Sequence, residues 1–191
     1  FKYSNNLIFK GMKILKWLVI IVVIISAIPL IAALFIKKDY EVGREIVINK
    51  PKQEVYEYTK YLKNQNEFSK WASLDPHMKK TFTGTDGTPG FISAWESDSS
   101  NVGAGEQEII AVKDGERIDY EIRFKKPFES TGSAYMTFTP QGTDQTKVKW
   151  VFYGTMPYPM NLMTVLMNMD EAVGNDLDTG LKNLKGIMEK K

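Results

Sequence analysis

The chain has 191 residues, of which 43% are hydrophobic and 25% charged, and its formal net charge is +2. Six of the 25 basic residues but none of the 23 acidic ones precede Asp39, which leaves a body with 19 basic and 23 acidic side chains and a net charge of −4. Such a body lacks the basic face that displaces counterions from nucleic acid, so no nucleic-acid partner is expected. The absence of cysteine excludes disulfides, thiol nucleophiles and thiolate metal sites.

The first predicted element is an apolar run of twenty residues without a charged side chain, from Trp17 to Ile36. Twenty residues at the helical rise span about 30 Å, the thickness of the hydrocarbon core of a bilayer. The hydroxyl of Ser26 can bond back to a helix carbonyl, and Pro29 is tolerated in a membrane span. We therefore expect a short basic segment over 1–16 and a transmembrane helix over 17–36.

Two other interpretations of the apolar run remain open. A buried core helix of this length is usually amphipathic, whereas this run is apolar on every side. A cleaved signal peptide has an apolar core of only about 7–15 residues before a site of small residues. Here the small residues Ser26 and Ala27 fall in the middle of the run, which continues to Ile36. The length favours an uncleaved membrane anchor.

The flanking lysines bear on membrane orientation. Four lie on the N-terminal side and two, Lys37 and Lys38, follow the run. The positive-inside rule then predicts a cytoplasmic N-terminus and an exported body in a single-pass membrane protein. If Met12 is the true start, the count falls to Lys13, Lys16 and the free amino terminus, and the asymmetry nearly disappears.

The body begins with a predicted strand over 39–49, which ends at Asn49-Lys50-Pro51. A helix over 52–63 follows, because Pro51 is favourable at a helix start. A second short helix is predicted over 64–71. The strand over 116–126 shows a clear two-residue period, with Ile118, Tyr120 and Ile122 on one face. Turn residues separate six predicted strands in all, over 79–84, 91–97, 102–113, 116–126, 130–140 and 146–153.

The chain ends in a long predicted helix from about 161 to 189, with apolar residues at spacings of three and four. The predicted order is one strand, two short helices, six strands and one long helix. We expect an α+β fold in which a seven-stranded antiparallel sheet curls around the last helix. One domain over 39–191 is long enough to bury a proper core.

Short motifs recur through the body in an order that is typical of one superfamily. They are I-V-I-N-K-P at 46–51, F-S-K-W at 68–71 with Asp75-Pro76, S-A-W-E at 93–96, V-G-A-G-E at 102–106, R-I-D-Y at 117–120 with F-K-K-P-F at 124–128, T-K-V-K-W at 146–150 and G-L-K-N-L-K at 180–185. In these motifs the chain resembles the SRPBCC superfamily, also called START-like or helix-grip. Within it the chain is similar to the bacterial branch of polyketide cyclase/dehydrase and lipid transport proteins. The resemblance covers nearly all of 40–189 and is more specific for fold than for function.

The resemblance implies a ligand cavity between the curved sheet and the long helix. Aromatic residues and methionines, whose side chains suit an adaptable apolar pocket, are the candidates for its wall. The alternative for each is an ordinary place in the core. The candidates are Trp71, Trp95, Tyr120, Phe124, Met136, Trp150 and Phe152, with Met160, Met163 and Met167 from the helix side.

Residues with catalytic potential are few. Asp75 and Glu96 stand in segments that relatives place near the cavity mouth, so they are the possible polar cavity residues; a buried carboxylate there would have a raised pKa. His77 is the only histidine and has no evident nucleophile beside it. No spacing of ligands predicts a metal site, and no cofactor is expected. No distinct catalytic set is present.

Three functions follow from the sequence. The favoured one is a membrane-anchored domain that binds an apolar small molecule or lipid without chemistry. An enzyme of the polyketide cyclase or dehydratase type, acting on an apolar substrate, is the second. The third is a protein-interaction module like the activators of the heat-shock ATPase. A filled core in place of a cavity would contradict the first two.

Overall fold

The computed structural model describes residues 2–99 and 101–190, so Phe1, Ser100 and Lys191 lie outside the described residues. The chain divides into two compact units, one formed by residues 1–38 and 156–166 and the other by 39–155 and 167–191. The helices are α1 (Lys2–Ala33), α2 (Lys52–Thr59), α3 (Leu62–Phe68), the 3-10 turn η1 (Trp71–Ser73), α4 (Leu162–Leu166) and α5 (Met169–Lys190). The strands are β1 (Asp39–Ile48), β2 (Lys79–Thr83), β3 (Ile92–Glu96), β4 (Ala104–Lys113), β5 (Arg117–Lys126), β6 (Ser130–Pro140) and β7 (Thr146–Thr155).

The first unit consists of α1, α4 and the segment that precedes α4. Within α1, the 19 residues from Leu15 to Ala33 are long and apolar enough to cross a bilayer, although signal sequences near an N-terminus meet the same criteria. The helix ends at Ala33, three residues before the end of the apolar run. There the buried side chain of Asn161 donates from Nδ2 to the carbonyl oxygens of Ala33 and Ile36, at 2.6 and 2.9 Å. These bonds satisfy carbonyl groups that have no partner within a helix.

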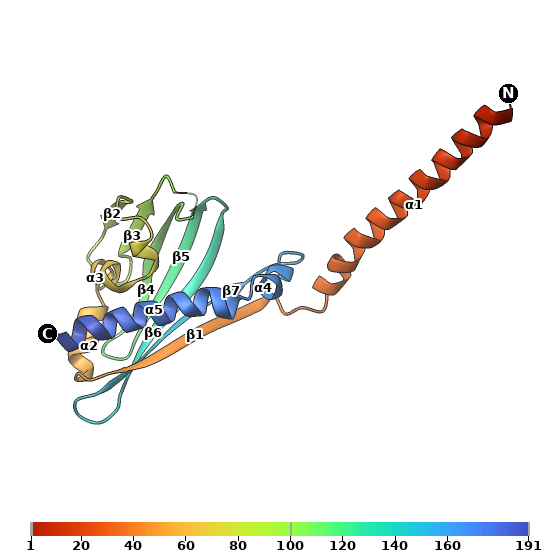
Figure 1. Ribbon diagram of the computed structural model, residues 1–191. Helices are drawn as coiled ribbons and strands as arrows, with labels where there is room; N and C mark the ends of the chain where they lie inside the picture. The colour runs from red at the N-terminus through yellow and green to blue at the C-terminus, as the bar shows by residue number, and fades with distance from the viewer. Residues whose placement is uncertain (1, 100, 191) are drawn as a thin grey trace. The chain divides into compact units, whose positions relative to one another are not determined.

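The second unit is a single antiparallel sheet of seven strands in the order β1-β7-β6-β5-β4-β3-β2, with α5 packed on β1 and β7. Figure 1 shows α5 crossing the sheet, with α3 beside it. The strands alternate as the sequence predicts. In β5 Ile118, Tyr120 and Ile122 are buried, and Gly115 at φ +67° makes the tight turn from β4 into β5. The predicted helix-grip fold class, α+β, is confirmed.

One end of the sheet and the C-terminal half of α5 form a closely packed core. Leu181, Leu184 and Met188 lie on the buried side of α5 at helical spacing, and they belong to the same apolar cluster as Ile118 and Met136. Burial of an apolar side chain of this size stabilises the fold by about 1.5–3 kcal/mol.

The long C-terminal helix differs from its prediction in one respect. Instead of one helix over 161–189, α4 and α5 are separated at Met167 and Asn168, and Asn168 takes φ +43°. The Asn168 carbonyl accepts the backbone N–H groups of Glu171 and Ala172, and its side chain donates to Glu171 Oε2. Asn168 therefore starts a new helix, because a left-handed residue cannot continue the previous one.

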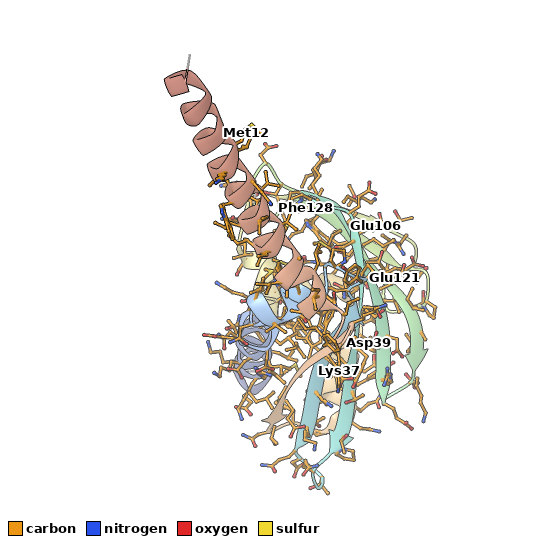
Figure 2. All side chains as sticks on the ribbon, turned by 90° about the vertical axis from the view of Figure 1, so that its right-hand side faces the viewer. Met12, Lys37, Asp39, Glu106, Glu121 and Phe128 are labelled. Carbon is orange, nitrogen blue, oxygen red and sulfur yellow. The ribbon has the colours of Figure 1, made fainter. Side chains whose placement is uncertain are left out.

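The outer face of the sheet is polar and carries a charged cluster at its centre. Arg123 on β5 donates to Glu106 at 2.7 Å, to Glu108 at 2.7 Å and to Glu121 at 2.5 Å, and Lys125 pairs with Glu106. Figure 2 labels Glu106 and Glu121 on this part of the sheet. Because these side chains alternate with the buried ones, each strand presents one face to the core and one to solvent.

Candidate functional site

A cavity of about 250 Å³ lies within the second unit, at the end of the sheet away from the packed core. Its wall comes from three parts of the fold. The side chains from α3 and the segment after it include Leu62, Gln65, Asn66, Ser69, Trp71 and Met78. Those from the sheet include Trp95, Gln107, Ile122, Phe124, Trp150 and Phe152, and α5 contributes Val173 and Leu177.

Aromatic rings form much of the wall. The rings of Trp95 and Phe124 meet edge to face with centroids 6.1 Å apart, and those of Trp71 and Trp150 do so at 6.0 Å. Such contacts are favourable beyond the area they bury, by about 0.5–1.5 kcal/mol each. They hold the rings in fixed orientations, so the apolar wall is preformed.

Two of these rings depend on a glycine in the neighbouring strand. A Cβ atom at Gly105 would lie 2.5 Å from Cζ2 of Trp95, which is the residue opposite it in the ladder. A Cβ atom at Gly132 would lie 2.6 Å from Cζ of Phe152. Only glycine leaves room for an aromatic ring to lie flat across the strand.

Two amides form the polar centre of the site. Gln65 on α3, only 7% exposed, accepts a hydrogen bond at Oε1 from Nε2 of Gln107 on β4, at 3.1 Å. Gln107 falls on the inner face of β4 because it is two residues away from both Gly105 and Ile109, which are buried on that face. Each amide has further donor or acceptor capacity, which can orient a polar group on a ligand.

Five of the ten residues that the sequence proposes for the wall do line the cavity: Trp71, Trp95, Phe124, Trp150 and Phe152. Tyr120 and Met136 are buried in the apolar core and are not part of the wall. Burial raises the pKa of the Tyr120 hydroxyl, whose oxygen has no hydrogen-bond partner among the described residues.

The three methionines proposed from the helix side lie elsewhere. Met160 and Met163 belong to the unit that contains α1, and Met160 is 58% exposed. Met167 lies in the second unit, at the break before α5, and is exposed. Met167 is not among the residues that line the cavity.

The two candidate carboxylates are engaged outside the wall. Asp75 accepts hydrogen bonds from the Ser97 hydroxyl at 2.5 Å and from the His77 backbone N–H at 2.9 Å, and these lower the pKa of Asp75. Glu96 is exposed and pairs with Lys126 at 3.2 Å. The contacts of both carboxylates are with residues near the ends of β2, β3 and β5. Among the described residues no cluster of three or more potential metal ligands occurs.

Sequence reasoning missed Gln65, Gln107, Ser93 and Lys80, all of which line the cavity. A signal for two of them was present. Gln107 interrupts the apolar face of its strand, and Gln65 stands between Leu62 and Phe68 on the buried side of α3. A polar residue at a core-facing position needs a partner, so two such glutamines are candidates for each other.

The family model described as polyketide cyclase / dehydrase and lipid transport matches residues 40–189. The chain belongs to this family. Its cavity lies where the sequence resemblance placed one, between the curved sheet and the long helix. A search of curated proteins finds none that matches the sequence.

Solved structures share the fold at low sequence identity. A protein from Nitrosospira multiformis is 19% identical, with a TM-score of 0.54 over 78% of this chain and 96% of that one. Norcoclaurine synthase from Thalictrum flavum, in complex with dopamine and hydroxybenzaldehyde, is 10% identical, with a TM-score of 0.60 over 80% of this chain and 87% of that one.

A third structure is the di-domain ARO/CYC StfQ from the steffimycin biosynthetic pathway. It is 10% identical, with a TM-score of 0.60 over 80% of this chain and 52% of that one. At these identities the likeness establishes the fold alone, and the fold hosts both enzymes and binding proteins.

Proposed function

We propose that this protein is a membrane-anchored domain that binds an apolar small molecule or lipid without chemical conversion. The observation that carries the proposal is the cavity of about 250 Å³ with its preformed aromatic wall. An unfilled apolar space in a core costs stability, because its lining atoms lose contacts. A fold that keeps such a space open beside a packed core is suited to a guest.

The volume limits the guest. A cavity of about 150 Å³ is enough for benzene, and drug-sized ligands occupy about 300–1,000 Å³. A cavity of about 250 Å³ therefore suits one or two aromatic rings or a short acyl chain. A two-chain lipid could place only part of one chain inside. The structurally similar norcoclaurine synthase was crystallised with two single-ring compounds, which supports a guest of this size.

The amide pair at the polar centre of the wall favours binding over catalysis. The amides of Gln65 and Gln107 can orient a guest, but an amide does not exchange a proton near neutral pH. The carboxylates that could do so, Asp75 and Glu96, are held by Ser97 and Lys126. The second candidate, a cyclase or dehydratase, is favoured by the family description and needs one of these carboxylates to turn inward.

The apolar helix completes the proposal. We assign residues 17–36 to the membrane, 1–16 to a short basic segment and 39–191 to the binding domain. Tethering keeps a carrier beside its hydrophobic source and raises the effective concentration of the guest without new contacts. The lysine count favours an exported domain.

Native mass spectrometry of the full chain in lipid nanodiscs tests the proposal. We expect a small apolar molecule to co-purify with the wild type. Ala134→Leu should displace it, because Ala134 lines the cavity and is 3% exposed. Ala172→Leu on the exposed side of α5 is the matched control and should retain it. A guest-free spectrum for the wild type, with a cavity that excludes added naphthalene, would contradict the binding function.

Chemistry is tested separately with the same preparation. If the co-purified guest is converted during incubation, and the double variant Asp75→Ala/Glu96→Ala stops the conversion while still holding the guest, the enzyme is the correct interpretation. Retention of an unchanged guest by both proteins supports binding alone.

A further inference from the structure

The charged side chain that lines the cavity among the described residues is Lys80, on the edge strand β2. The other polar groups of the wall are amides and hydroxyls, and no aspartate, glutamate or histidine of the described chain takes part in it. A single cation in an otherwise apolar and neutral wall bears on the chemical class of the guest. This inference rests on the proposed binding function and deepens it.

The strand pairing places Lys80 on the inner face. Lys80 stands opposite Trp95 in the ladder between β2 and β3, and both line the cavity. Its neighbours Lys79 and Thr81 alternate to the other face and are exposed, whereas Lys80 is half-buried. A lysine in this position covers apolar surface with its stem and keeps its ammonium group at the rim.

Lys80 has no ion pair or hydrogen bond within the described part of the chain. Among the other described lysines, Lys60 pairs with Glu57 at 2.6 Å and Lys126 pairs with Glu96 at 3.2 Å, whereas Lys70, Lys79 and Lys149 have no acidic partner either. What distinguishes Lys80 from these unpaired lysines is its place in the cavity wall. Near an apolar wall the effective dielectric constant is below that of water, so an anion there would be attracted more strongly than at an open surface.

Polar groups continue from Lys80 into the cavity across successive elements. Ser93 on β3 is the diagonal neighbour of Lys80 and stands opposite Gln107 on β4. Gln107 in turn bonds to Gln65 on α3 at 3.1 Å. The polar row of Lys80, Ser93, Gln107 and Gln65 thus runs from the edge of the sheet to the buried amide pair, beside the aromatic wall.

We propose that the guest is an amphipathic carboxylic acid whose carboxylate binds at Lys80 and whose apolar body lies against Trp95, Phe124 and Trp150. The carboxylate supplies the negative counter-charge that Lys80 lacks among the described residues, and a hydrogen bond between an ammonium and a carboxylate is about twice as strong as a neutral one. The amide pair accepts or donates to a second polar group on the body of the guest. The volume holds one or two rings, or a short acyl chain.

A pair of probes that differ in charge tests the assignment. We would measure the dissociation constants of 2-naphthoate and its neutral analogue 2-naphthamide by isothermal titration calorimetry. The full chain would be in lipid nanodiscs, with the heat of empty nanodiscs subtracted. The wild type should bind the carboxylate about tenfold more tightly than the amide, as expected for one charge-assisted contact.

Three variants locate the effect. Lys80→Met should abolish the preference through weaker binding of naphthoate alone, and its unchanged affinity for naphthamide shows that the cavity is intact. Lys80→Arg should keep the preference. Lys79→Met removes the neighbouring charge from the opposite face and should leave both dissociation constants unchanged. Raised salt should reduce the preference in the wild type but not in Lys80→Met.

The outcomes separate this inference from the function on which it rests. Equal binding of both probes by the wild type and by Lys80→Met would overturn the carboxylate site and leave the binding function in place. A preference lost equally in Lys79→Met would also overturn it, since the effect would then come from general surface charge. Failure of the wild type to bind either probe would overturn the binding function itself.

Discussion

Nε2 of Gln107 donates a hydrogen bond to Oε1 of Gln65 across 3.1 Å, and this contact joins β4 to α3 inside the cavity wall. Two amides that bond to each other are tolerated in a largely apolar site because the bond replaces part of the hydrogen bonding to water that both lose on folding. The contact also sets the distance between the sheet and the helix that covers it. It is thus both a structural link between β4 and α3 and part of the polar row of the site.

Replacing one of the two glutamines should lower the free energy of unfolding more than replacing both. Gln107→Leu leaves the nearly buried amide of Gln65 unsatisfied and should lower the free energy of unfolding by about 1–3 kcal/mol. The double variant Gln65→Leu/Gln107→Leu should recover most of that loss. Urea unfolding followed by tryptophan fluorescence measures both, with the exposed Gln53→Leu as control. Additive losses in the double variant would mean that the two amides are not coupled.

A methyl group at Gly105 should disturb the aromatic wall. Its Cβ would lie 2.5 Å from Cζ2 of Trp95 and 2.7 Å from the carbonyl oxygen of Arg123, so either the ring or the backbone must move. Overpacking of this kind costs about 1–3 kcal/mol, and the displaced Trp95 should also weaken binding of 2-naphthamide. Thermal unfolding and calorimetry measure the two effects.

Gly186→Ala is the matched control for that substitution. Gly186 lies within α5, and a Cβ there would meet nothing within 4 Å. Alanine is the better helix former by about 0.5–1 kcal/mol, so Gly186→Ala should raise the melting temperature while binding is unchanged. If Gly105→Ala also raises the melting temperature, the contact with Trp95 does not constrain the strand.

The charged cluster around Arg123 should make stability depend on pH in the acid range. Hydrogen bonds from Lys125 and Arg123 lower the pKa of Glu106 below its ordinary value of 4.5. A carboxylate with a lowered folded-state pKa stabilises the fold fully above its unfolded pKa, and that contribution is lost as the pH falls through the folded value. Glu106→Gln should therefore cost roughly 0.5–1 kcal/mol at pH 7 and less at acid pH.

Urea unfolding at several pH values between 7 and 3 checks this expectation. Glu129→Gln removes the same charge from an exposed loop position that has no ion pair among the described residues. Its curve should run parallel to that of the wild type. Parallel curves for Glu106→Gln and the wild type would show that the cluster contributes nothing through Glu106.

A charge in the middle of α1 tests the proposed membrane anchor. Ile24 lies near the centre of the apolar stretch, and an arginine at a membrane centre costs about 2.5–3.5 kcal/mol in helix insertion. Ile24→Arg should shift the protein from the carbonate-resistant membrane fraction to the soluble one, whereas Ile24→Leu should not. The intact mass of the membrane-extracted wild type should include α1. A mature mass without these residues would identify a cleaved signal sequence.

Much of the fold could be predicted from local patterns. The two-residue period of β5 and the helical spacing of Leu177, Leu181 and Leu184 each follow from the geometry of a single element that buries one face. The break at Asn168 could not, because the apolar spacing continues across it. There the left-handed backbone and the bond to Glu171 end one helix and begin the next.

The site was only partly predictable, because membership of a cavity is not a property of one strand. Tyr120 and Phe124 lie on the same face of β5, yet Phe124 lines the cavity and Tyr120 is packed in the core. The two-residue period of a strand shows that a side chain lies on the inner face of the sheet. It does not show whether that part of the face borders the cavity or the packed core. That position depends on where α3 and the two halves of α5 close over the curved sheet.

By itself the sequence determined the apolar N-terminal run, the order of the strands and helices, and the face on which each aromatic side chain lies, because each depends on composition or short-range period. Only the tertiary structure decided which of those side chains surround a space. It alone brought Gln65 of α3 to Gln107 of β4 and placed Lys80 in the wall without an acidic partner among the described residues. Such contacts join residues far apart in the chain, and they exist only once the sheet has curved and the helices have packed against it.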